Sequence, residues 1–72
     1  MLWTESSNVC FPDQYFDYSQ SFHVIHGSIK IIFTYTNIIN ILTKGEIIQI
    51  PATTPFSLIT GSHGAIFEIK IH

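Results

Sequence analysis

β-Branched side chains dominate this 72-residue chain and restrict what it can fold into. The sequence contains fourteen isoleucines, seven threonines and two valines, but only two alanines and three leucines. β-Branched side chains lose rotamer freedom in a helix and pack well on a pleated sheet. No segment combines apolar residues at helical spacing with the capping residues that a helix needs. We therefore expect an all-β protein.

Short apolar segments alternate with turn-forming residues along the whole chain, an arrangement typical of a β-barrel or β-sandwich. We expect one domain over residues 1–72, built as a β-barrel or β-sandwich of about seven or eight short antiparallel strands. The expected strands are Leu2–Glu5, Tyr15–Tyr18, Phe22–His26, Ser28–Tyr35, Ile38–Thr43, Glu46–Ile50, Phe56–Thr60 and Ala65–Ile71.

Charge and cysteine content exclude several classes of protein. Three lysines, no arginine and a net charge of −2 argue against nucleic-acid binding, which needs cations to neutralise phosphates. Prolines and glycines interrupt the uncharged stretch between Glu46 and Glu68, so it does not read as a membrane span. The single Cys10 cannot form an intramolecular disulfide, and no signal peptide is visible. We expect a cytoplasmic protein.

Adjacent isoleucines suggest that both faces of several strands are apolar. Successive side chains of a strand point to opposite faces, so Ile31-Ile32, Ile38-Ile39 and Ile47-Ile48 each place one isoleucine on either face. A closed barrel with some exposed isoleucine would account for this pattern. We favour a second subunit on the outer face, in an obligate homodimer. Exchange of Leu2–Glu5 between the two chains would be one way to join them.

From Gln20 to the C-terminus the sequence resembles the cupins, a superfamily of small β-barrels, and this resemblance implies a jelly-roll arrangement of the strands. The stretch FHVIHGSIKIIF is similar to the strand pair that closes the first cupin motif. That motif ends with glutamate, six residues and glycine, and here Gln20 and Gly27 occupy those two places. A glycine is physically reasonable where a strand leaves a turn, because a positive φ or a close backbone approach excludes a Cβ.

The stretch LTKGEIIQIPATTPF resembles the second cupin motif, Gly-x5-Pro-x-Gly-x2-His-x3-Asn. Gly45 and Pro51 keep the first two positions of that motif. The other three positions differ, since the second glycine, the histidine and the asparagine are replaced by Thr53, Phe56 and Thr60. The resemblance therefore implies that the backbone of the fold is kept while side chains of the site are changed.

Cupins typically bind iron, manganese, nickel or zinc through two or three histidines and a glutamate. The corresponding positions here hold Gln20, Phe56 and either the pair Asp13/Tyr15 or the pair Gln14/Phe16. Phenylalanine has no lone pair to donate, and a neutral amide is a poor transition-metal ligand. These replacements at the positions of the metal ligands predict a domain without a metal site and without another cofactor.

The mouth of such a barrel is the expected binding site, because ligand pockets are concave and mainly apolar. Strand parity and the resemblance together predict a lining of Tyr15 (or Phe16), Gln20, Phe22, His26, Phe56 and Thr60. His26 shares the parity of Gln20, whereas His23 should face the opposite way. Rings, an amide and an imidazole would suit a small polar ligand, similar to a sugar or a nucleotide. The alternative is a barrel filled by its own side chains.

Three functions follow from these expectations. We favour binding of a small ligand by a dimer without catalysis. A second hypothesis is an interaction protein that docks on a macromolecule through its surface, like the small inhibitors that phages and mobile elements encode. A third is an enzyme that resembles the metal-independent sugar-nucleotide isomerases of the cupin superfamily, with His26 and Tyr15 as its acid/base pair.

Overall fold

The computed structural model describes all 72 residues and contains six strands and no helix. All strand pairings are antiparallel, which confirms the all-β expectation, although the strands are fewer than the seven or eight expected. The strands are β1 (Leu2–Glu5), β2 (Cys10–Gln14), β3 (Gln20–Phe33), β4 (Ile39–Thr43), β5 (Ile47–Ile50) and β6 (Phe56–Ile71). No helix is present that could cross a membrane.

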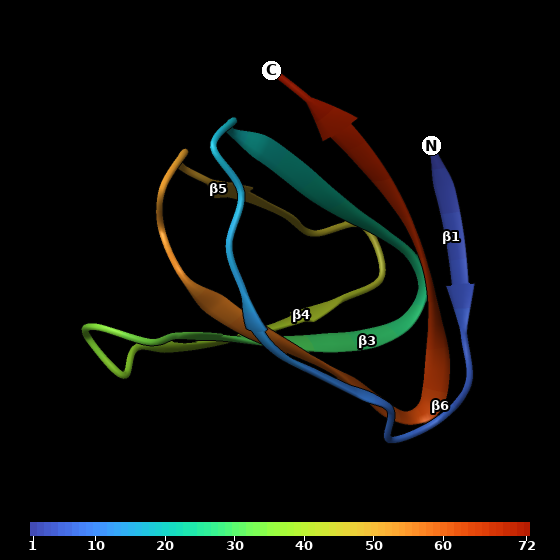
Figure 1. The fold of residues 1–72 in the computed structure, drawn as a ribbon. Coiled ribbons are helices and arrows are strands. Elements are labelled where there is room, and N and C mark those ends of the chain that lie inside the picture. Colours follow the sequence, from blue (N-terminus) through green and yellow to red (C-terminus); the bar gives the residue numbers. More distant parts are fainter.

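The lower strand number arises because β3 and β6 are long and bent, and each takes the place of two shorter expected strands. Gly27 in β3 and Gly64 in β6 adopt φ values of 77° and 73°, in the left-handed region that glycine tolerates best. Irregularities in the β3–β6 register lie beside Gly27, so the bend is a pair of β-bulges rather than a turn. Both strands continue through it, as Figure 1 shows.

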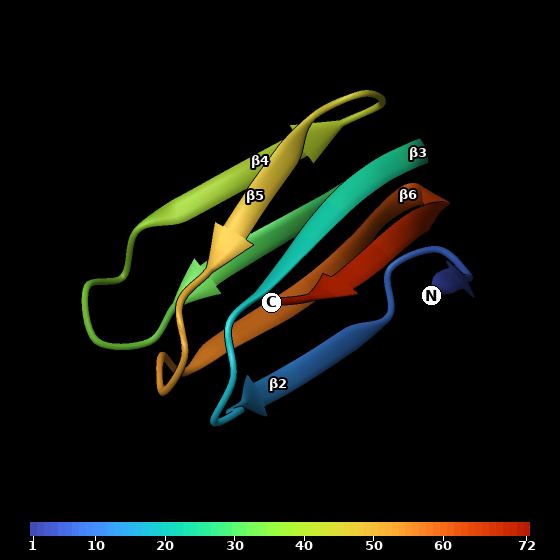
Figure 2. The ribbon, with the colours of Figure 1, turned by 90° about the horizontal axis from the view of Figure 1, so that it is seen from above.

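The two bent strands divide the sheet into two layers. The first half of β3 pairs with β5 and with the second half of β6, which also pairs with β1. The second half of β3 pairs with β4 and with the first half of β6, which also pairs with β2. We call β1–β6–β3–β5 the first layer and β2–β6–β3–β4 the second layer. Figure 2 shows β3 and β6 running side by side between the other strands.

The N-terminal part differs from the expectation in one strand. Tyr15–Tyr18 is not a strand, whereas Cys10–Gln14 forms β2 and pairs with β6. Pro12 lies within β2, and proline is tolerated on an edge strand, where no ladder hydrogen bond is lost. The register of β2 also shifts between Phe11 and Gln14, so this edge is irregular.

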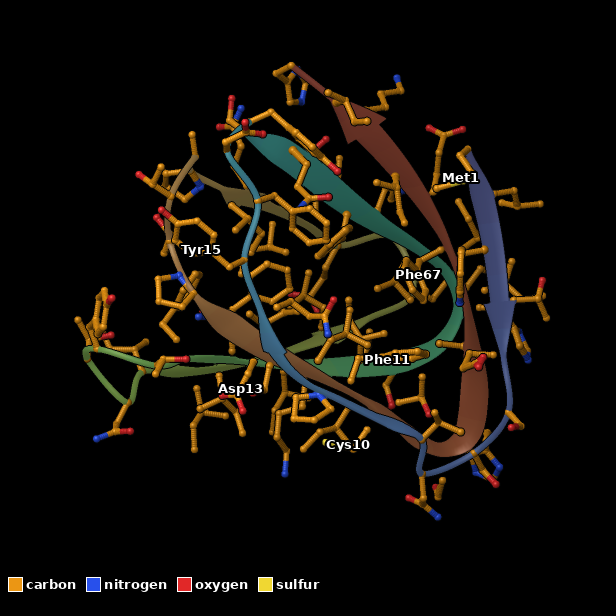
Figure 3. The ribbon with its side chains drawn as sticks, in the orientation of Figure 1. Met1, Cys10, Phe11, Asp13, Tyr15 and Phe67 are labelled. Atoms are coloured by element: carbon orange, nitrogen blue, oxygen red, sulfur yellow. The ribbon has the colours of Figure 1, made fainter.

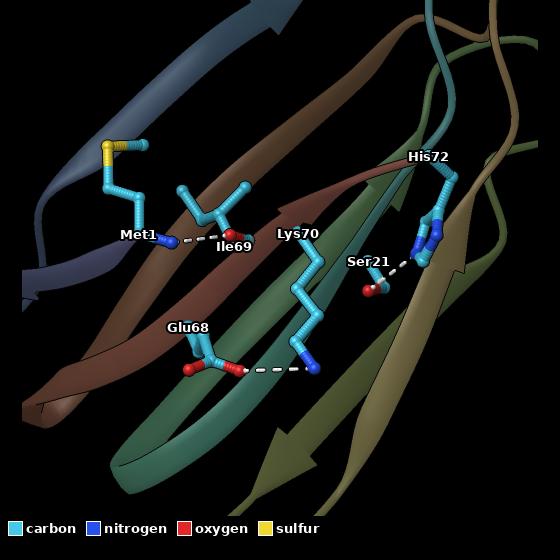
Figure 4. Close-up of polar contacts among 6 residues, drawn as sticks. All are labelled: Met1, Ser21, Glu68, Ile69, Lys70 and His72. Carbon is cyan, nitrogen blue, oxygen red and sulfur yellow. Dashed lines mark hydrogen bonds and ion pairs between the residues drawn. The ribbon is translucent and has the colours of Figure 1, made fainter.

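β1 pairs with β6 of its own chain. The N-terminal amino group of Met1 donates to the Ile69 carbonyl at 2.8 Å, and the Ile69 N–H donates to the Met1 carbonyl at 2.7 Å (Figure 4). The expected strand Leu2–Glu5 is therefore present, and this pairing needs no exchange between subunits.

The hydrophobic core lies between the layers and receives side chains from both. Its ten buried residues are Phe22, Val24, Ile29, Ile31, Leu42, Ile50, Phe56, Leu58, Ala65 and Phe67. Ile31 is fully buried and Ile32 is half-buried, as alternation along β3 predicts. The same expectation is wrong for Ile38-Ile39, which are both exposed, because Ile38 precedes β4 and belongs to the β3–β4 connection.

Candidate functional site

A cavity of about 240 Å³ opens between the layers beside the core. Eleven of its thirteen lining residues are hydrophobic, and the other two are Gln14 and Gln20. In Figure 3, Phe11 and Phe67 point into the space between the layers, whereas Cys10 points away from it. The lining consists of Met1, Trp3, Phe11, Gln14, Phe16, Tyr18, Gln20, Phe22, Phe56, Leu58, Phe67, Ile69 and Ile71.

Aromatic rings form most of the cavity wall and contact one another. The Phe22 ring lies 5.9 Å from the Phe56 ring and 5.8 Å from the Phe67 ring, measured between centroids. The Phe16 ring extends this cluster, with its centroid 6.3 Å from that of Phe56 and 5.3 Å from that of Tyr18. These separations are typical of tilted and edge-to-face pairs, which hold rings in fixed orientations. The wall is therefore a pre-formed aromatic surface.

The two glutamines of the lining differ in how their amides are satisfied. The Gln14 Nε2 donates to the Pro12 carbonyl at 3.0 Å and is partly exposed to solvent. Gln20 is only 3% exposed, and its Nε2 has no hydrogen-bond partner in the protein. A buried amide without a partner is costly, at roughly 1–3 kcal/mol. Gln20 thus carries an unpaired hydrogen-bond donor and belongs to a lining that is apolar except for its two glutamines.

The structure brings three of the six expected site residues together. Gln20, Phe22 and Phe56 all line the cavity. Of the two alternatives Tyr15 and Phe16, the structure places Phe16 in the lining, while Tyr15 is 59% exposed and lies outside it.

His26 and Thr60 also lie outside the cavity. A bulge between Val24 and His26 reverses the alternation of β3, so His26 is exposed and pairs with Ile66 on the outer face. The expectation that His26 points inward is therefore wrong. Thr60 is buried, but its hydroxyl accepts from the Val9 N–H at 2.9 Å and donates to the Ser6 carbonyl at 2.6 Å. Thr60 holds the connection between β1 and β2.

Several lining residues are absent from the lining that the sequence predicts. Trp3 and Phe67 are register partners in β1 and β6, and both face the cavity. The alternation of side chains in the expected strands Leu2–Glu5 and Ala65–Ile71 could have predicted that this pair faces the interior. Phe11 carries no such signal, because the sequence does not predict the strand that holds it. Tyr18 lies in an irregular segment, where periodicity carries no information about direction.

The donor set of the cavity does not fit a metal ion. None of its lining side chains is a carboxylate, an imidazole or a thiol. No three histidine, cysteine, aspartate or glutamate side chains lie close enough together elsewhere to hold an ion. At two of the cupin metal positions, Phe56 belongs to the aromatic wall of the cavity and Gln20 presents an amide. Thr53, in place of the second motif glycine, keeps the left-handed backbone with φ of 57°.

The carboxylate of Glu46, whose pKa is shifted, lies away from the cavity. The pKa of Glu46 is lowered because the Thr43 N–H and the Thr43 hydroxyl donate to its carboxylate, at 2.8 and 2.9 Å. These residues close the connection between β4 and β5. Glu46 therefore supports a turn and has no access to a ligand between the layers.

A second concavity, of about 440 Å³ and with a polar lining, lies on the outer face of the first layer. Its residues are Ser21, His23, Ile47, Gln49, Glu68, Lys70 and His72. His72 Nε2 lies 3.0 Å from the Ser21 hydroxyl, and Lys70 Nζ lies 3.8 Å from Glu68 Oε1 (Figure 4). Because these side chains are largely exposed, their contacts contribute little stability.

The outer face of the second layer is apolar. Register partners align the four residues of this isoleucine face, which are Ile32, Ile39, Ile41 and Ile59. Ile39 and Ile41 are 57% and 64% exposed. Lys30 lies between Ile41 and Ile59 in register and is exposed. Asp13 lies at the rim, where its N–H donates to the Ser57 hydroxyl at 3.2 Å. Neither Lys30 nor Asp13 forms an ion pair within the chain.

Solved structures resemble this protein closely in fold and weakly in sequence. A cupin superfamily protein from Desulfitobacterium hafniense has a TM-score of 0.84 and 11% identity, over 97% of this chain and 62% of that protein. Oxalate decarboxylase from Bacillus subtilis has a TM-score of 0.84 and 17% identity, over 94% of this chain and 19% of that enzyme. The polyketide cyclase RemF from Streptomyces resistomycificus has a TM-score of 0.85 and 21% identity, over 97% of this chain and 50% of that enzyme.

No family model and no curated protein matches the sequence. The chain spans less than two thirds of each of the three proteins above. The TM-scores show a common architecture, and identities this low leave activity open. Two glycines of the cupin motifs keep a backbone role in that architecture, since Gly27 lies at the bend of β3 and Gly45 in the turn before β5, both with positive φ. This protein has the cupin fold.

Proposed function

We propose that this protein is a non-catalytic binding domain that holds a small, mainly apolar molecule in the cavity between its layers. The observation that carries the proposal is the pre-formed cavity of about 240 Å³, lined by eleven hydrophobic residues and by a buried amide without a partner. A sugar would need more polar partners than two glutamines provide, so the proposed ligand is less polar than the sequence alone suggested.

Binding without catalysis is favoured because the lining offers no carboxylate, imidazole or thiol, so the Tyr18 phenol in the lining has no such group beside it for acid–base chemistry. The isomerase-like alternative needs His26 and Tyr15 in the cavity, and both side chains lie outside it. The lone Cys10 is exposed and suits a reducing compartment, so we propose that binding takes place in the cytoplasm.

Tetralin is a suitable probe for this cavity, because it is a ten-carbon hydrocarbon that contains a planar aromatic ring. We expect a Kd of about 0.2 mM, from roughly 0.5 kcal/mol per non-hydrogen atom. A threefold excess over Kd should raise the Tm by about 3–6 °C. Trp3 is the only tryptophan and lines the cavity, so its fluorescence should change with the same Kd.

Two isoleucines of β6 provide a matched pair of control variants. Ile69 lines the cavity and Ile59 lies on the isoleucine face, and both are half-buried. Ile69→Phe should fill the cavity and abolish the effect of tetralin on Tm and Trp3 fluorescence. Ile59→Phe should leave both effects intact. Equal responses in the two variants, or no response in the unmodified protein, would contradict binding between the layers.

We also propose that the protein acts as a homodimer through the isoleucine face. Burying exposed isoleucines is favourable, at roughly 1.5–3 kcal/mol per side chain. Lys30 and Asp13 make this face self-complementary, because a two-fold axis lets the lysine of one chain meet the aspartate of the other. The alternative function, docking on another macromolecule, would use the same surface.

A charge swap tests the dimer. We expect sedimentation equilibrium to give twice the 8.2 kDa chain mass at micromolar concentration. Lys30→Glu and Asp13→Lys should each weaken association about tenfold, since two symmetric pairs contribute up to about 1 kcal/mol each. The double variant, with both charges exchanged, should restore the dimer. A monomeric unmodified protein, or a double variant weaker than either single one, would favour docking on a different partner.

A further inference from the structure

We propose that the ligand is a planar ring compound with a carbonyl or similar hydrogen-bond acceptor, which the Gln20 amide recognises. This inference rests on the proposed function and names the chemistry of the molecule that would enter the cavity. It follows from two features of the same space, a wall of contacting rings and one buried donor without a partner.

The aromatic wall favours a flat molecule. Seven of the thirteen lining residues are aromatic, namely Trp3, Phe11, Phe16, Tyr18, Phe22, Phe56 and Phe67. Successive contacts between Phe67, Phe22 and Phe56 hold these rings in place. Such rings prefer offset or edge-to-face contact with another ring, at centroid separations of about 4.5–7 Å. A planar ring would gain these contacts with little rearrangement of the protein.

Gln20 adds a requirement for an acceptor. Its Nε2 is buried without a hydrogen-bond partner, and such a donor is costly until it finds an acceptor. A ligand carbonyl would satisfy it, whereas a hydrocarbon of the same shape would leave it unpaired. A site built to hydrogen-bond a ligand discriminates against the analogue that lacks the partner atom.

The identity of residue 20 also indicates which kind of contact with a ligand takes the place of metal coordination. The resemblance to cupins aligns Gln20 with a glutamate that would coordinate a metal ion. A carboxylate accepts hydrogen bonds or coordinates a cation, whereas an amide nitrogen donates. With Phe56 at the histidine position, the same part of the cavity presents a donor and a ring. The geometry suits a neutral, flat acceptor and excludes recognition of a cation by Gln20 Nε2.

The test compares 1-tetralone with tetralin, two ring systems that differ by one carbonyl oxygen. In the unmodified protein 1-tetralone should bind about tenfold more tightly, which corresponds to about 1.4 kcal/mol, the scale of one neutral hydrogen bond. In ¹H–¹⁵N spectra the Gln20 side-chain amide signal should move downfield with 1-tetralone and stay nearly unchanged with tetralin. Isothermal titration calorimetry gives the two Kd values.

Gln49 supplies the matched control, because this glutamine of β5 is exposed on the outer face of the first layer and does not line the cavity. Methionine has a side chain of similar length without a donor. Gln20→Met should bind both compounds with equal affinity, and Gln49→Met should keep the tenfold preference.

The outcomes separate this inference from the proposed function. Equal binding of both compounds by the unmodified protein would overturn the role of Gln20 while leaving cavity binding in place. A preference that survives in Gln20→Met would do the same. Failure of both compounds to bind the unmodified protein would contradict the proposed function and, with it, the role of Gln20.

Discussion

Gly27→Ala is expected to unfold this protein. A Cβ at this position would lie 2.1 Å from the carbonyl oxygen of Gly64 and 2.9 Å from its carbonyl carbon. Both are backbone atoms of β6, so no side chain can rotate away to relieve the overlap. The φ of 77° adds the cost of the left-handed region, roughly 1–2 kcal/mol. The total should exceed about 4 kcal/mol, which is comparable to the whole stability of so small a domain.

Gly45→Ala is the matched control for this prediction. Gly45 has a φ of 91°, but a Cβ there would meet no atom within 4 Å. Only the cost of the left-handed conformation remains, partly offset by the lower entropy of the unfolded chain, so about 1 kcal/mol should be lost. Urea denaturation followed by far-UV circular dichroism measures both variants. Similar losses in the two would show that the β3–β6 contact at Gly27 is not tight.

Much of the fold can be predicted because strand propensity and turn chemistry agree along most of the chain. The β-branched segments around Ile31 and Ile48 form strands, and Gly45 occupies a turn with positive φ. Glycine alone does not distinguish a turn from a bulge, so the sequence predicts a break between two strands where β3 bends at Gly27. Whether the chain continues depends on pairing with β6, which local sequence does not encode.

The site is less predictable, for a related reason. Gln20 and Phe22 lie on one face, as predicted, because regular alternation holds between them. The bulge after Val24 shifts that alternation by one residue and turns His26 outward. A single inserted residue reverses every later side chain of a strand, so parity fails beyond the first unrecognised bulge. Aromatic residues on irregular segments, such as Phe16 and Tyr18, can be placed only by the tertiary structure.

Phe56→Ala is expected to destabilise the protein by about 3–5 kcal/mol, the usual cost of removing a buried phenylalanine ring. Phe56 is 2% exposed, and its ring contacts those of Phe16 and Phe22. Phe56 corresponds to a metal-binding histidine in the cupin motif, so this variant tests whether the Phe56 ring is part of the hydrophobic core. The loss should be large because two neighbouring rings also lose their contacts and the cavity grows.

Phe16→Ala removes a ring from the same cluster at a half-buried position, and it should cost only about 1–2 kcal/mol. Because the loss expected for Phe56→Ala is close to the whole stability of the domain, this variant should be partly unfolded at about 25 °C and melt at low temperature. Benzene should raise its Tm more than that of the unmodified protein, since it can occupy the space of the missing ring in a dry, apolar cavity. Differential scanning calorimetry with and without benzene measures both effects. A loss below about 1 kcal/mol for Phe56→Ala would mean that the two layers close over the missing ring, and that the wall of the cavity is soft rather than pre-formed.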